Sequence, residues 1–346
     1  MPTSTQPCMD NKLSVASDSA AEIHGETVAW ELDAGVPAEV RPGDSPQPDG
    51  LRRFAWLSGA LVLAYGWVLL QLVLYAARTE LHSHILLIPF VSIWLIRQEP
   101  RVWPRECAPS KGWAAVFTMA GTAALVYGLI TGMGKGALSR NDWLAVMVLS
   151  FLCFLAAGAF YLLGRKWLAE VAFPVAFLLF MVPLPDAVVD RTEHLLMVFS
   201  ADAADLLYAV AGIPYLRDDQ VFQLPGITLR IAQECSGIRS SWVLVITSLV
   251  AAYLFLRTPW RRALLVALVI PLGILRNGFR VLVLGWLCVH QGPHMIDSDI
   301  HHRGGPIFFA ISLIPLFFLM WWLRRGEAAD APAATSGTGG KGPGNF

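Results

Sequence analysis

Long apolar runs are the feature that most limits what this chain can fold into. Of its 346 residues, 55% are hydrophobic and only 15% are charged, and the mean hydropathy is +0.53. Several runs reach the roughly 20 residues that an α-helix needs to cross a bilayer. The 13 Trp and 18 Phe residues suit positions that face lipid or the membrane interface. The chain is therefore predicted to be an all-α polytopic membrane protein.

Seven or eight transmembrane helices are predicted from these apolar runs, and eight segments are assigned. They are placed at residues 54–76, 82–97, 113–132, 142–164, 167–185, 237–256, 262–288 and 305–323. The ends of the chain, residues 1–50 and 326–346, are rich in small and polar residues, which predicts disordered tails. The membrane domain is accordingly expected to cover residues 51–325. Because the first apolar run follows about fifty polar residues, we expect it to act as an uncleaved insertion signal.

The basic residues predict the orientation of the spans. Most of them fall on one side when eight spans are assigned, and the positive-inside rule makes that side cytoplasmic, together with both termini. These residues are Arg52, Arg53, Arg97, Arg101, Arg105, Lys111, Arg165, Lys166, Arg257, Arg261, Arg262, Arg324 and Arg325. An odd number of spans would place the last two outside, which favours eight.

The long loop of residues 186–236 is then external. Apolar and acidic residues alternate between residues 187 and 212 with helical spacing, which predicts a short amphipathic helix at the interface. Residues 221–233 follow as a predicted β-hairpin, in which Pro225-Gly226 supplies a type II turn. This hairpin leads directly to Cys235.

Several classes of site are disfavoured by composition. The formal net charge is zero and no nucleic-acid-binding motif is present, so no nucleic-acid partner is expected. The five cysteines show no CxxC or CxxxH spacing, so neither a disulfide framework nor a zinc site is predicted. No cofactor is expected.

Cys235 is the cysteine whose position best suits chemistry. It directly precedes the predicted sixth span on the outer side, and unpaired amides at a helix N-terminus favour a thiolate. Arg239, one turn further on, adds positive charge. The alternative is a packed interfacial thiol, or one paired with Cys288 at the outer end of the seventh span. From position alone both interpretations stay open.

Arginines inside the seventh span give a second candidate group. Arg280 lies about two turns from the outer end, and Arg276 and Asn277 share its helix face. An arginine within a span is costly and usually marks a functional interior site. Its guanidinium would suit a substrate carbonyl or an oxyanion. The alternative is that the side chains extend to the outer interface.

Histidines form the third group. His301 and His302 precede the Gly304-Gly305-Pro306 start of the eighth span, where a neutral imidazole would suit a general base. Asp297 and Asp299 could orient the imidazole. The other predicted external histidines are His82, His84, His194, His290 and His294. For any one of them a solvated loop position is the simpler interpretation, and a metal site is the rival functional one.

These residues together resemble the exosortase/archaeosortase family. The resemblance rests on the run Cys235-Ser236-Gly237-Ile238-Arg239-Ser240, on Asn277-x-x-Arg280 and on His301-x-x-x-Gly305. Ser83-His84, Met181-Val-Pro-Leu-Pro185 and Gly212-Ile-Pro214 agree with it. It covers about residues 54–323.

The resemblance implies a membrane-embedded cysteine peptidase or transpeptidase in the bacterial inner membrane, active at the periplasmic face. Its partners would be membrane-anchored substrate proteins that end in a Pro-Glu-Pro-like (PEP-CTERM) sorting signal, a transmembrane helix and a basic tail, often alongside exopolysaccharide production. By this resemblance Cys235 is the nucleophile, His301 the general base or acid, and Arg280 the stabilising cation. The supporting or alternative residues are Arg239, Asn277, Arg276, His302, His84 and Ser236.

Two other functions remain as alternatives. A transporter of an anionic lipid or polysaccharide precursor would use Arg276 and Arg280 to line its path, although no repeated halves are evident in the sequence. A His-ligated membrane metalloprotease would need a metal site, although no H-E-x-x-H motif is present.

Overall fold

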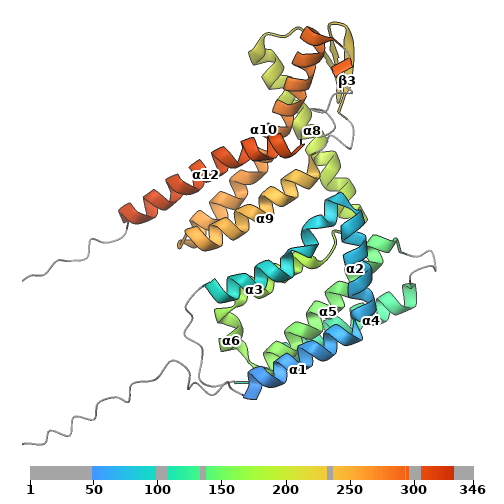
Figure 1. Ribbon diagram of the computed structural model, residues 1–346, viewed down its shortest axis with the longest axis vertical. Coiled ribbons are helices and arrows are strands. Elements are labelled where there is room, and N and C mark those ends of the chain that lie inside the picture. Colours follow the sequence, from blue (N-terminus) through green and yellow to red (C-terminus); the bar gives the residue numbers. More distant parts are fainter. Residues whose placement is uncertain are drawn as a thin grey trace, which may run out of the picture. The chain divides into compact units, whose positions relative to one another are not determined.

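The computed structural model describes residues 49–98, 108–132, 138–231, 237–292, 294–295 and 305–330, and these are mostly helical (Figure 1). The first helices are α1 (Asp49–Ala64), α2 (Gly66–Arg78), η1 (Glu80–Leu86), α3 (Ile88–Gln98), α4 (Lys111–Thr131) and α5 (Arg140–Leu162). They are followed by α6 (Arg165–Glu170), α7 (Ala172–Phe177), η2 (Leu178–Met181) and α8 (Asp186–Ala211). Strands β1 (Leu216–Asp218), β2 (Val221–Leu224) and β3 (Ile227–Arg230) lead to α9 (Ile238–Phe255), α10 (Pro259–Gln291) and α12 (Gly305–Asp330).

The prediction of an all-α polytopic membrane protein is confirmed. Seven helical segments of the described chain are long and apolar enough to cross a membrane, namely η1 together with α3, and α4, α5, α8, α9, α10 and α12. The number is eight if α1 and α2, which are bent by 69°, form one span. α8 meets this test by length and composition, although the sequence indicated an interfacial helix. The predicted fifth span, residues 167–185, differs from a regular span because it is divided into α6, α7 and η2.

This divided segment nevertheless runs along the full length of α5. At its start, the amide of Arg165 donates to Ser110 Oγ, and the amide of Ser110 donates to the carbonyl of Phe160 near the end of α5. At its other end, Asn141 Nδ2 in the first turn of α5 donates to the carbonyl of Leu184 at 2.6 Å. The segment therefore covers the distance between the two ends of α5 despite its breaks.

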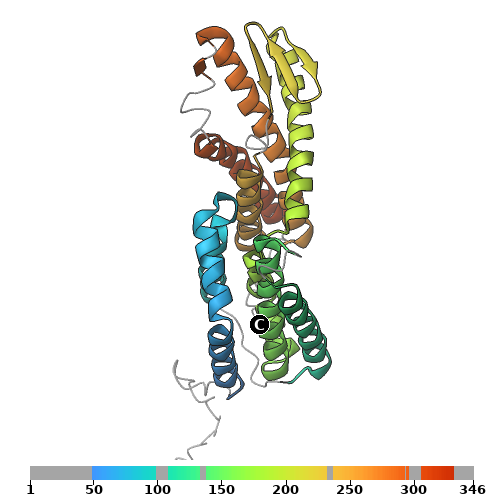
Figure 2. The same cartoon turned by 90° about the vertical axis from the view of Figure 1, so that its right-hand side faces the viewer.

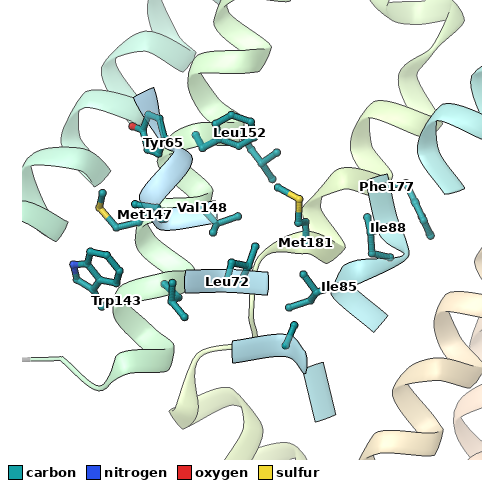
Figure 3. Close-up of a cluster of buried hydrophobic side chains, with 14 residues drawn as sticks. Tyr65, Leu72, Ile85, Ile88, Trp143, Met147, Val148, Leu152, Phe177 and Met181 are labelled. Carbon is teal, nitrogen blue, oxygen red and sulfur yellow. The ribbon is translucent and has the colours of Figure 1, made fainter. Parts of the chain in front are cut away.

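A large apolar cluster holds the N-terminal helices together. Side chains of α2, η1, α3, α5, α7 and η2 converge in it, among them Leu72, Ile85, Val148 and Met181 (Figure 3). Tyr65, at the bend between α1 and α2, lies within hydrogen-bond distance of Ser150 Oγ at 2.8 Å. The cluster thus fixes η1 relative to α5 and η2.

The second group of packed helices is α9, α10 and α12. Their shared core includes Leu244, Val269 and Leu316, which are almost fully buried. At one end of this group, Arg261 Nη1 donates to the carbonyl of Leu323 at 2.9 Å. At the other end, the rings of Phe279 and Phe308 lie 6.3 Å apart. α9 and α12 therefore pack along α10 from its start to about Phe279.

The C-terminal half of α10 packs instead against α8 and β3 (Figure 2). Tyr208 of α8 is fully buried and donates to the carbonyl of Val281 at 2.9 Å. Gly285 is required here, because a Cβ at this position would overlap the Tyr208 hydroxyl. Arg217 of β1 pairs with Asp202 and Asp205 of α8 at 2.6 Å and 3.3 Å, which ties the sheet to that helix.

The predicted β-hairpin is confirmed. β2 and β3 pair antiparallel, with Leu224 opposite Ile227, and Gly226 has a φ of +84°, as a type II turn requires. β1 adds a third strand to give the order β1-β2-β3. This strand had no clear alternating pattern in the sequence.

Candidate active site

The structure describes some of the predicted site residues and not others. Arg239, Arg276, Asn277, Arg280 and His84 are described. The predicted residues outside the described ranges are Cys235, Ser236, His301 and His302. The geometry of the site is therefore built from Gly237, the first described residue after the cysteine motif.

Gly237 begins α9 in a left-handed conformation, with a φ of +71°. Glycine adopts this conformation without the steric cost that a Cβ imposes. Its carbonyl accepts hydrogen bonds from the amide of Ser241 at 2.9 Å and from Ser240 Oγ at 3.1 Å. The chain therefore turns sharply where the cysteine motif enters the helix.

Arg276 and Asn277 of α10 lie directly against this turn. Arg276 Nη2 donates to the Gly237 carbonyl at 3.4 Å and to Ser241 Oγ at 3.2 Å. A Cβ on Gly237 would lie 3.0 Å from Asn277 Oδ1. Arg276 and Asn277 are 7% and 2% exposed, so both polar groups are buried beside the start of α9.

Arg280 lies one turn beyond Arg276 on α10 and is half-buried. Arg276, Asn277 and Arg280 lie in one continuous helix, as the predicted shared face requires. The contact with Gly237, however, is made by Arg276. Sequence reasoning gave that residue only a supporting role.

A second set of contacts reaches α9 from η1. Arg239 forms an ion pair with Glu80, and Trp242 Nε1 donates to His84 Nε2 at 3.2 Å. Because His84 Nε2 accepts, the ring proton is on Nδ1, which lies 3.1 Å from the carbonyl of Leu81 and donates to it. His84 is therefore a neutral imidazole that joins the two helices.

Sequence reasoning included Arg239 and His84 but missed their partners Glu80 and Trp242. His84 and Trp242 are separated by 158 positions, so no local pattern relates them. Trp242 also lies against Phe180 of η2, with ring centroids 5.7 Å apart. The first turns of α9 are thus held from three directions, by η1, η2 and α10.

The sequence left two other interpretations open, a pairing of Cys235 with Cys288 and a metal site formed by histidines. Cys288 is a free thiol that is 3% exposed, whereas Cys235, its possible disulfide partner, lies outside the described residues. Within the described ranges, no group of three or more His, Cys, Asp or Glu side chains is arranged to bind a metal ion.

Chemically, the described part of the site offers buried hydrogen-bond donors. A buried guanidinium and a buried amide next to a helix N-terminus suit a carbonyl oxygen that gains negative charge. The guanidinium is fixed by its bonds to Gly237 and Ser241, so it needs little reorganisation to bind such a group.

A model of the transmembrane exosortase family matches residues 76–318, which is more than half of the chain. The matched region runs from the end of α2 into α12, and it contains the cysteine motif, Arg276, Arg280 and His301. No curated protein matches the chain, and no solved structure matches it. The family match and the helical membrane fold agree, and the chain belongs to the transmembrane exosortase family.

Proposed function

We propose that this protein is a cysteine peptidase or transpeptidase that cleaves C-terminal sorting signals of membrane-anchored proteins at the outer face of the membrane. The observation that carries the proposal is the contact of Arg276 and Asn277 with Gly237, two residues after Cys235. Family membership supports the class of reaction. The substrates would carry a Pro-Glu-Pro-like motif, an apolar helix and a basic tail.

Cys235 is the proposed nucleophile. His301 takes the proton of the thiol, and the thiolate attacks the carbonyl carbon of the scissile peptide bond. The tetrahedral intermediate collapses to a thioester as the C–N bond breaks, and the leaving amine takes the proton from His301. An amine or water then attacks the thioester, and the Cys235 thiol is restored.

Arg280 is the proposed cation for the oxyanion, and Arg276 is a second candidate because it contacts the turn that follows the nucleophile. Arg239 and His84 are positioning residues, since they hold the first turns of α9 against η1. Asn277 limits how far that turn can move toward α10. His302 and Ser236 remain alternatives for the proton transfer and for hydrogen bonding at the nucleophile.

The test uses a secreted reporter fused to such a C-terminal signal, expressed with the full-length protein in membranes. Cys235→Ala should abolish processing, while membrane insertion stays normal. Cys153→Ala is the matched control, because Cys153 is a half-buried thiol within α5, away from α9. Normal processing by Cys235→Ala would show that the proposed mechanism is wrong.

Thiol reactivity separates an enzyme from a transporter. A membrane-impermeant thiol reagent should modify Cys235 at neutral pH faster than it modifies an ordinary exposed cysteine, because a helix N-terminus and nearby arginines favour the thiolate. A transporter in which Cys235 is incidental predicts ordinary reactivity. In that case the reporter would also remain unprocessed.

A further inference from the structure

A groove lies between α10 and α12, next to the candidate site. Its volume is about 250 Å³, and its walls include Leu275, Arg276 and Phe279 of α10 and Phe308, Ile311 and Pro315 of α12. On each helix the lining residues follow the spacing of a single helix face. Leu275 and Ile311 at the rim are 48% and 46% exposed, so an apolar segment can enter from the side.

Arg276 connects this groove to the candidate site. Its Nη2 atom donates to the Gly237 carbonyl and to Ser241, whereas its Nη1 atom is buried and has no hydrogen-bond partner among the described residues. A buried guanidinium nitrogen without an acceptor is costly, so a ligand that supplies an oxygen would be favoured. The side chain itself is 7% exposed and lines the groove.

One wall of the groove also contains a break in the helical hydrogen bonding. Pro315 lies inside α12 and has no amide hydrogen, so it cannot donate to the carbonyl of Ile311, four residues earlier. The groove is thus lined by Arg276 on one helix and, on the other, by the turn whose Ile311 carbonyl lacks its usual helical donor. The other lining side chains are apolar except for Ser312, whose hydroxyl donates to the carbonyl of Phe309 at 2.6 Å.

From these observations we infer that the groove between α10 and α12 binds the substrate's own membrane segment where its helix meets the cleavage site. The inference rests on the function proposed above. Arg276 Nη1 donates to a backbone carbonyl of that segment, and apolar substrate side chains fill the groove. Because Arg276 also contacts Gly237, a segment bound here reaches the start of α9, two residues after Cys235 in the sequence.

A peptide fits these features better than an acyl chain. The end of a helix leaves backbone N–H and C=O groups without partners, and in a membrane these groups must find partners in protein. Arg276 at the groove offers a hydrogen-bond donor for such a carbonyl, whereas the hydrocarbon of an acyl chain has no acceptor to place there. A lipid is the competing occupant, and crosslinking distinguishes it.

The experiment places a photo-crosslinking amino acid at Ile311 in full-length protein that carries Cys235→Ala, so that the reporter binds without being cleaved. Phe317 is the matched control, because it is on the same helix, is also 46% exposed and does not line the groove. We expect several-fold more crosslinked reporter from Ile311 than from Phe317.

A second pair of variants tests the groove by processing in the wild-type background. Leu275→Trp should fill the groove and slow reporter processing several-fold, without lowering the thermal midpoint of the solubilised protein. Ile270→Trp, on the same helix but outside the groove, should leave processing unchanged; Ile270 is 57% exposed.

The outcomes separate the groove from the proposed function. Equal crosslinking at both positions, or crosslinking of Ile311 to lipid alone, overturns the groove assignment if the wild-type chain still cleaves the reporter. Normal processing by Leu275→Trp overturns it as well. Failure of the wild-type chain to cleave the reporter refutes the proposed function itself, and the groove inference with it.

Discussion

Replacing Gly237 by alanine tests the contact on which the candidate site depends. The left-handed φ of +71° costs a residue with a Cβ about 1–2 kcal/mol. The new carbon would also lie 3.0 Å from Asn277 Oδ1 and 3.2 Å from Arg276 Nη2, closer than the roughly 3.5–4.0 Å of an ordinary contact. To relieve this contact, the first turn of α9 must move away from α10.

That movement breaks the hydrogen bond from Arg276 to the Gly237 carbonyl. A hydrogen bond to a charged group contributes about 1.5–3 kcal/mol to stability. If the same contact orders the site during catalysis, kcat/KM for the reporter should fall roughly 10- to 150-fold. Gly212→Ala is the matched control, because Gly212 has a φ of +68° and no atom within 4 Å of an added Cβ.

The assay compares thermal midpoints and reporter processing for both variants in solubilised full-length protein. Both should lose stability through backbone strain, and Gly237→Ala should lose more. Only Gly237→Ala should lose processing. If Gly237→Ala matches Gly212→Ala in thermal midpoint and processes the reporter at the wild-type rate, the contact with α10 has no role in the site.

Three further predictions concern the surroundings of the site. Trp242→Phe removes the N–H donor to His84, which should lower the free energy of unfolding by about 1–3 kcal/mol and slow reporter processing. A thermal midpoint and a processing rate equal to those of the wild type would contradict this. The hydrogen bond from Tyr215 to Asp205, with burial and the Asp205 charge, raises the pKa of Tyr215 above its ordinary value. The folded state therefore favours protonated Tyr215, and this contribution to stability is complete below about pH 10, the ordinary pKa of tyrosine, and is lost as the pH rises through the raised pKa. In a pH series above about pH 10, the thermal midpoint of Tyr215→Phe should fall less than that of the wild type. Gly285→Ala should lower the thermal midpoint because its Cβ would overlap a buried tyrosine hydroxyl, and a thermal midpoint equal to wild type would argue against that packing.

Local features of the fold could be predicted from the sequence. The hairpin turn at Pro225-Gly226 depends on the dihedral preferences of two adjacent residues, so it was recognisable without tertiary information. The placement of Arg276 and Asn277 on one face of a long helix follows from helical spacing alone. The cysteine motif was specific enough to indicate the exosortase family, to which the family comparison also assigns the chain.

Contacts between distant segments could not be predicted in this way. The pairing of Glu80 with Arg239 and of His84 with Trp242 depends on how η1 packs against α9, which no periodic pattern encodes. Within the divided fifth segment, Pro174 lies in the first turn of α7. Proline is tolerated in the first turn of a helix but disrupts a helix interior, so it is consistent with a new helix starting there. An apolar run alone does not reveal such a break.

From the sequence, the cost of burying an arginine in a span was the reason for assigning function to Arg276 and Arg280. The fold supports Arg276 instead through its contacts. The 18 residues of α9 rise about 27 Å, close to the roughly 30 Å of a hydrocarbon core. If α9 crosses that core once, Gly237 at its start lies near a membrane boundary, and so does Arg276, which contacts it. The 33 residues of α10 rise about 50 Å, so this helix extends well beyond that level toward α8 and β3. A charge costs less near a boundary than at the centre of a bilayer, so burial cost is weak support for function here. What supports Arg276 is its geometry: one nitrogen fixes the turn that follows Cys235, and the other is left without an acceptor in the described structure, beside a groove that a substrate can enter.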